Sequence, residues 1–131
     1  MSQASGTVAS GTVASGTVRV FAYGTLRDPN LLAVVLGHVF SGVRRPAVIH
    51  GFRRAHVEGF DFPVIVREEG GRIDGILLEG LTEEDLVNLD AYEDVAAGLY
   101  DRVEGDVTVD GEPADAPPLK AFVYVAGSLL K

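Results

Sequence analysis

Two short stretches of this sequence hold residues whose types and spacing could support catalysis, and the first is the segment LTEEDLVNLDAYED. A helix that advances about 100° per residue would place Glu93 between Leu86 and Leu89 on its apolar face. A carboxyl group on that face loses solvent, which raises its pKa and suits it to exchange protons. A structural alternative stays open, in which Glu93 forms an ion pair with Arg102.

Asp90 is the second acid on the same predicted face, three residues before Glu93. Because it lies near Tyr100 and Arg102 in the expected arrangement, we expect it to accept an orienting hydrogen bond and not to act as a second catalyst.

The second stretch is VFAYGTLRDPN, in which an apolar strand stops at Gly24 before a polar turn. The backbone N–H groups of Gly24, Thr25 and Leu26 could converge there, and such groups of amides bind anions. Thr25 adds a hydroxyl group. Strand, glycine and helix also follow one another in proteins without an anion site, so both interpretations stay open.

Other catalytic chemistries have little support. The sequence contains no cysteine, which excludes disulfides, thiolate metal sites and a thiol nucleophile and fits the reducing cytoplasm. The three histidines, at positions 38, 50 and 56, lack the spacing of metal ligands, and neither Ser41 nor Ser128 lies in a nucleophile-elbow context. We therefore expect neither a metal nor another cofactor.

Composition indicates one ordinary globular domain. The chain has 131 residues, of which 47% are apolar and 23% charged, with a net charge of −8. This negative charge argues against a nucleic-acid partner, and we expect the arginines in VRRPAVIHGFRRAHVEG to be solvated strand ends. No stretch of about 18 apolar residues or secretory signal is present, so we expect a cytoplasmic protein without membrane contact.

The N-terminus carries three copies of Ala-Ser-Gly-Thr-Val between Ala4 and Val18. A five-residue repeat turns successive valines to opposite faces of a strand, so it builds no apolar face. We expect residues 1–18 to be a flexible tail and residues 19–131 to form the folded domain. The alternative is a partial extension of the first strand.

Short strands with two helices between them predict an α+β fold. The sequence favours strands over 17–23, over 47–58 with a bend at Gly51, and over 60–68, and the pair Gly70-Gly71 predicts a hairpin into a third strand. Two later strands follow, in LYDRVEGDVTV and LKAFVYVAG. Such strands favour an antiparallel sheet that curls toward a small barrel.

Capping residues define the two helices. In RDPNLLAVVLG, Asp28 is the expected N-cap, Pro29 the first helical residue and Gly37 the end. Thr82 is the expected N-cap of the second helix, whose first turn is acidic.

The combination of FAYGTLRDP, GF at 51–52, FP at 62–63, DGILLEGL, LDAYE, YDRV and AFVYV resembles the gamma-glutamylcyclotransferase-like family. That group includes gamma-glutamylamine cyclotransferase and the avirulence-induced-gene-like proteins of plants and bacteria. The resemblance runs from Val20 to Val125. It implies a small mixed, mainly antiparallel β-barrel with flanking helices and a cavity built on the loop Tyr23-Gly24-Thr25-Leu26.

The resemblance also implies a role for particular residues. Glu93 matches the family's single essential glutamate, Tyr100 and Arg102 match a Tyr-x-Arg that follows it, and Tyr124 matches a strand tyrosine that can face the cavity. Asp94 departs from the pattern, because many members have glycine there, and DVAAG lengthens the path to Tyr100.

The implied activity is that of a transferase acting on a small gamma-glutamyl compound. The donor's own amine would attack its γ-carbonyl, forming 5-oxoproline and releasing a free amine, with Glu93 as general acid and base. The alternative is a non-catalytic module that binds a small carboxylate or an acylated partner in the same cavity.

Overall fold

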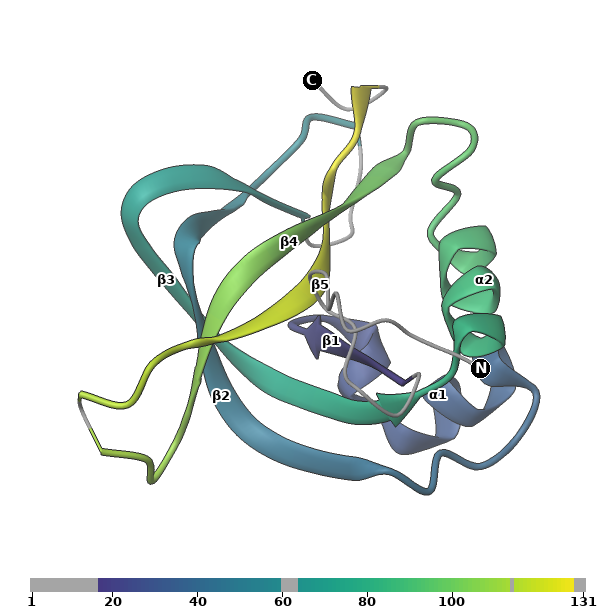
Figure 1. Ribbon diagram of the computed structural model, residues 1–131. Helices are drawn as coiled ribbons and strands as arrows, with labels where there is room; N and C mark the ends of the chain where they lie inside the picture. Colours follow the sequence, from purple (N-terminus) through teal and green to yellow (C-terminus); the bar gives the residue numbers. More distant parts are fainter. Residues whose placement is uncertain (1–16, 60–63, 114, 129–131) are drawn as a thin grey trace, which may run out of the picture.

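Five strands close into a barrel in this computed structural model, which describes residues 17–59, 64–113 and 115–128 (Figure 1). The strands run in the spatial order β1-β3-β2-β4-β5, and all neighbours are antiparallel except β1 and β5, whose parallel pairing closes the barrel. Their bounds are β1 Val18–Ala22, β2 Val43–Ala55, β3 Val64–Leu81, β4 Tyr100–Val109 and β5 Leu119–Ala126. The predicted α+β fold with a mixed, mainly antiparallel barrel is confirmed.

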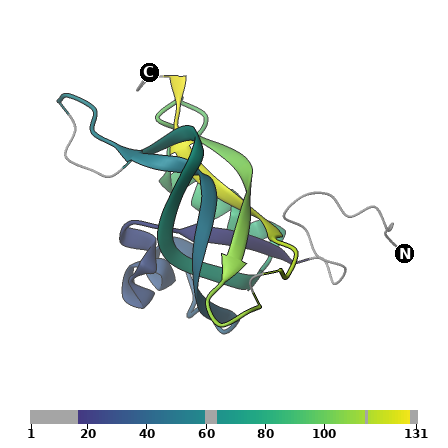
Figure 2. The same ribbon diagram turned by 90° about the vertical axis from the view of Figure 1, so that its left-hand side faces the viewer.

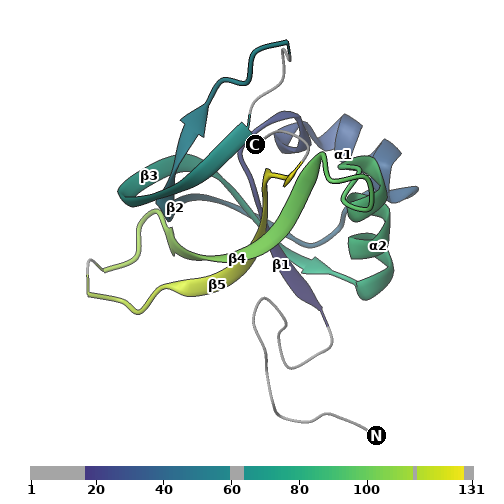
Figure 3. The same ribbon diagram turned by 90° about the horizontal axis from the view of Figure 1, so that it is seen from above.

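Two α-helices, α1 (Pro29–Leu36) and α2 (Glu83–Tyr92), lie on the same side of this barrel (Figures 1 and 3). The Asp28 side chain caps α1 by accepting from the N–H of Asn30, and Gly37 ends the helix in the left-handed conformation. Thr82 and Asp85 form a reciprocal capping box at the start of α2. The predicted caps of both helices are therefore confirmed.

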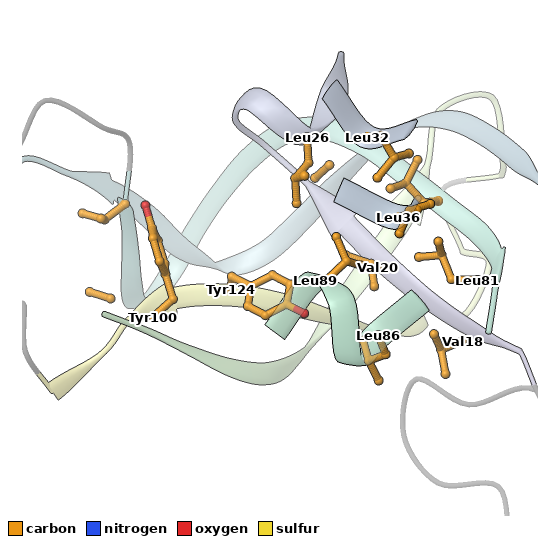
Figure 4. Close-up of a cluster of buried hydrophobic side chains, with 14 residues drawn as sticks. Val18, Val20, Leu26, Leu32, Leu36, Leu81, Leu86, Leu89, Tyr100 and Tyr124 are labelled. Atoms are coloured by element: carbon orange, nitrogen blue, oxygen red, sulfur yellow. The ribbon is translucent and has the colours of Figure 1, made fainter. Parts of the chain in front are cut away.

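Apolar side chains form two clusters, one inside the barrel and one between the barrel and the helices. Phe21, Ile49 and Phe52 fill the inside. Figure 4 shows the second cluster, with Tyr100 at one end and Val18 at the other. Burying this much apolar surface is the main source of stability for a domain of this size, so the helices are held against the barrel by their leucines.

The glycine pair at 70–71 does not form the hairpin that the sequence predicts. Strand β3 continues through it from Val64 to Leu81, and β2 pairs with β3 on both sides, at Phe52 with Arg67 and at His50 with Arg72. Gly51 and Gly70 have φ values of 88° and 83°, which bend the two strands together where their register shifts. The chain reverses direction earlier, between Ala55 and Val64, and the described residues 56–59 of this connection lead away from the barrel (Figure 2).

The repeat lies outside the described residues up to position 16, and β1 begins at Val18, one residue before the predicted domain boundary. In the part of the chain that the structure describes, no helix has the length and apolar character needed to cross a membrane.

Candidate active site

A pocket of about 320 Å³ opens where β1 ends beside the C-terminus of α2. Its walls come from three separate parts of the chain: the end of β1 with the loop that follows, the segment from α2 into β4, and β5. The lining residues are Phe21, Ala22, Tyr23, Gly24, Thr25, Leu26, Tyr92, Glu93, Leu99, Tyr100 and Tyr124.

The loop after β1 forms one wall. Thr25 begins a short 3₁₀-helix, η1 (Thr25–Arg27), and Gly24 is its N-cap residue. The first N–H groups of such a helix have no partner inside it. Across the described residues, the backbone N–H groups of Gly24, Thr25 and Leu26 make no backbone hydrogen bond outside the regular elements. This wall therefore offers free donors to a ligand.

Glu93 occupies the opposite wall, at the C-terminal end of α2. It is the residue directly after the last helical one, and its N–H donates to the carbonyl of Leu89 at 2.9 Å. Asp94 then adopts a φ of 57°, in the left-handed region that helices commonly use to end. The turn thus directs the chain away from the helix axis and leaves the Glu93 side chain half-buried at the pocket.

The pKa of the Glu93 carboxyl is raised by its loss of solvent, from an ordinary value of 4.5 to about 7. Among the described residues, the Glu93 carboxylate takes part in no ion pair or hydrogen bond that would compensate for this loss. A carboxyl group with this pKa populates both protonation states near neutral pH, so it can accept a proton and return it.

The alternative ion pair between Glu93 and Arg102 is wrong. The Arg102 guanidinium Nε instead lies 3.6 Å from Asp90 Oδ1, and its charge stacks over the ring of Phe122 at 4.8 Å. Asp90 Oδ1 also accepts a hydrogen bond of 2.7 Å from the Tyr124 hydroxyl. Asp90 is therefore the orienting acceptor that the sequence predicts, and it leaves Glu93 free of the arginine.

Three buried tyrosines line the pocket, and hydrogen bonds connect Tyr23 and Tyr124 to Asp90. The Tyr23 hydroxyl donates to the backbone carbonyl of Tyr124 at 2.5 Å, across 101 positions of sequence. Burial raises the pKa of all three hydroxyls, that of Tyr100 to about 12, with the nearby charge of Glu93 adding to the effect. Figure 4 shows Tyr100 at one end of the apolar cluster between the barrel and the helices, and Tyr124 nearer the middle of this cluster. Near neutral pH the three hydroxyls are neutral donors.

All seven residues predicted for the site lie around this one pocket: Glu93, Tyr23, Gly24, Thr25, Leu26, Tyr100 and Tyr124. Sequence reasoning missed four further lining residues, Phe21, Ala22, Tyr92 and Leu99. Each of these four residues lies within two positions of a predicted site residue. The sequence signal that could have identified them is their position as apolar neighbours of the motif residues.

Comparisons with known proteins give one consistent result. The family model for "Gamma-glutamyl cyclotransferase, AIG2-like" matches residues 20–130. Protein AIG2 C of Arabidopsis thaliana is 31% identical over 106 residues, which are 81% of this chain and 61% of that protein. The chain therefore spans less than two thirds of this relative.

Solved structures share the fold. The solution structure of an Arabidopsis thaliana protein matches with a TM-score of 0.69 and 28% identity, over 92% of this chain and 66% of that one. The structure of a gamma-glutamyl cyclotransferase matches with a TM-score of 0.68 over 84% of this chain and 66% of that one. At 17% identity, the second match concerns the barrel and its helices alone.

Proposed function

Because this chain belongs to the gamma-glutamyl cyclotransferase, AIG2-like family, we propose that it converts a small gamma-glutamyl amide into 5-oxoproline and a free amine. The observation that carries the proposal is the unpaired, half-buried carboxyl of Glu93, with a pKa of about 7, in a pocket that also has free backbone donors. A carboxyl group with this pKa can both accept a proton from the attacking amine and donate a proton to the leaving amine.

In the proposed reaction, Glu93 takes a proton from the donor's α-ammonium group. The neutral nitrogen then attacks the γ-carbonyl carbon and forms the five-membered ring. The bond to the leaving nitrogen breaks as Glu93 returns the proton to that nitrogen. The carboxylate then takes the second proton from the ring nitrogen and passes it to the released amine, so the products are 5-oxoproline and an ammonium ion. Holding amine and carbonyl together supplies an effective molarity on the order of 10⁵ M or more, so the protein needs mainly a clamp and a proton carrier.

The clamp in this proposal is the loop after β1. Backbone N–H groups of Gly24, Thr25 and Leu26 bind the donor's α-carboxylate or the oxyanion of the tetrahedral intermediate. The neutral hydroxyls of Tyr23, Tyr100 and Tyr124 surround the donor. Because the sequence holds no cysteine, the proposal includes a reducing compartment, the cytoplasm, as the site of action.

The test is a panel of gamma-glutamyl amino acids and amines, incubated with the protein and assayed for 5-oxoproline. Glu93→Gln keeps the shape of the side chain and removes its basicity, so we expect kcat to fall by about 100-fold or more. Glu69→Gln changes an exposed glutamate of β3 outside the pocket and should keep the parent rate. Parent-like turnover by Glu93→Gln would refute the role of Glu93.

The same panel separates an enzyme from a binding module. A protein that only binds would gain thermal stability from gamma-glutamyl compounds without forming 5-oxoproline, and Glu93→Gln would gain as much as the parent. These two results together would refute the cyclotransferase proposal and support a non-catalytic binding module.

A further inference from the structure

A second hollow, of about 670 Å³, adjoins the pocket and shares Tyr23, Gly24 and Thr25 with it. It lies on the barrel side of the loop, against Ile76 of β3. Three guanidinium groups line it, from Arg27 of η1 and from Arg44 and Arg54 of β2. We refer to these three residues as the arginine shelf.

The arginine shelf has no carboxylate partner among the described residues. The neighbouring arginines differ, because Arg45 pairs with Glu79 at 2.6 Å and Arg53 with Glu68 at 3.0 Å. The positive charges of Arg45 and Arg53 are thus compensated by carboxylates, whereas those of the arginine shelf are not.

Hydrogen bonds hold part of the shelf in place without neutralising it. Arg27 Nε donates to the carbonyl of Gly24 at 3.1 Å, and Arg44 Nη2 donates to the carbonyl of Arg27 at 2.5 Å. Within the described structure, the other terminal nitrogen of Arg44, Nη1, is buried without an acceptor. This nitrogen is shielded from solvent and therefore lies out of a ligand's reach, whereas the exposed side chains of Arg27 and Arg54 can bind an anion.

The charges of the hollow favour an anion with more than one negative charge. Asp28 is the single acid in its lining, and the Asp28 carboxylate already accepts from the N–H of Asn30 as the cap of α1. Three positive charges against one leave a net charge of about +2 on a chain whose net charge is −8. Guanidinium groups bind carboxylates with paired hydrogen bonds, so two carboxylates would match the shelf.

The hollow with the arginine shelf lies next to the pocket, and the two share lining residues. Tyr23 and Arg54 both line the hollow, and the positive charge of Arg54 opposes the rise in the Tyr23 pKa that burial causes. Tyr23 lines both spaces. A donor held across these shared residues would place its γ-carbonyl at Glu93 and its leaving half in the second hollow.

We propose that Arg27, Arg44 and Arg54 determine donor specificity by binding the leaving amine, and that the preferred leaving amine carries two carboxylates, as in gamma-glutamyl-glutamate. This inference rests on the proposed cyclotransferase activity and adds the class of leaving group. The loop amides bind the glutamyl half, and the arginine shelf binds the half that departs.

The test compares three donors of nearly equal size whose leaving amines are glutamate, glutamine and glutamine amide, with two, one and no negative charges. Each charge removed should lower kcat/KM of the parent by about tenfold, as expected for a lost hydrogen bond to a charged group. In the double variant Arg44→Gln/Arg54→Gln the three values should lie within about threefold of one another. Arg72→Gln, an exposed arginine of β3 outside both hollows, should keep the parent's ratios.

Arg54→Gln alone keeps the test decisive if the double variant does not fold, because Arg54 is exposed. Its expected result is a smaller ratio between the glutamate and glutamine donors. Equal kcat/KM values for all three donors in the parent would overturn the specificity proposal and leave the cyclotransferase standing.

Absence of 5-oxoproline from every donor would instead refute the proposed function. Calorimetric titration of the parent with the same three donors then decides the role of the shelf. Affinity that falls with each lost charge supports it, and equal affinities overturn it.

Discussion

Relative to the parent, Glu93→Gln should have unchanged stability near pH 4.5 and should become more stable as the pH rises to about 7. The folded state holds this proton up to a pH of about 7, whereas the unfolded chain releases it at about 4.5. Between these values the folded state binds more protons, so the parent loses stability as the pH rises. Glutamine stays neutral at every pH and lacks this loss.

The size of the effect follows from the two pKa values. Each pH unit between them is worth about 1.4 kcal/mol, so the interval from 4.5 to about 7 corresponds to about 3 kcal/mol. Because the side chain is only half-buried, we treat this value as the upper limit. The tyrosines around Glu93 do not titrate in this range, since burial raises the pKa of each hydroxyl further.

The assay is urea denaturation of parent and variant at intervals from pH 4.5 to pH 8.5, analysed by linear extrapolation. Subtracting the two curves removes every titrating group that the proteins share and leaves the contribution of Glu93. Glu69→Gln serves as the control for the same replacement at an exposed position outside the pocket. If the difference for Glu93→Gln is constant with pH, the carboxyl is not desolvated and the argument for its role fails.

Four further results are expected. Tyr124→Phe removes the hydrogen bond to Asp90 and should cost about 1–3 kcal/mol in urea denaturation, whereas parent-like stability would contradict a buried bond. The bond from His38 Nε2 to Asp85 raises the pKa of His38, so Asp85→Asn should lower that pKa in an NMR titration. The loss of stability in Asp85→Asn should be largest in mild acid, where His38 is protonated and Asp85 ionised, and should shrink as the pH rises through the pKa of His38. Asp94→Gly should be about 1 kcal/mol more stable than Asp94→Ala, because alanine is strained at a φ of 57°, and equal melting temperatures would argue against that conformation.

Local signals made the helices predictable. The caps at Asp28 and Thr82, the proline at the first helical position and the glycine at position 37 act over a few residues, and their hydrogen bonds are those expected from the sequence. Glu93 shows the limit of such signals. The helical wheel places it on the apolar face, but the helix ends at Tyr92, and the turn at Asp94 decides where the carboxyl points.

Distant contacts decided what the sequence left open. From sequence alone, a glycine pair at 70–71 is compatible with a hairpin. In the structure β2 pairs with β3 on both sides of this pair, so the glycines bend a continuous strand instead of ending it. Likewise, the sequence left open whether Glu93 forms an ion pair with Arg102. The position of β4 against α2 selects Asp90, and no pattern within α2 contains that information.

The parallel pairing of β1 with β5 also constrains when the pocket can appear during synthesis. Val20 pairs with Phe122, and the Tyr23 hydroxyl reaches the carbonyl of Tyr124, so the first and last strands meet at the pocket. A nascent chain that has not yet delivered β5 lacks one wall of the pocket and the acceptor for Tyr23. Ligand binding in this pocket therefore requires that β5 has been synthesised and has paired with β1. Nascent chains that lack β5 should not bind a ligand there.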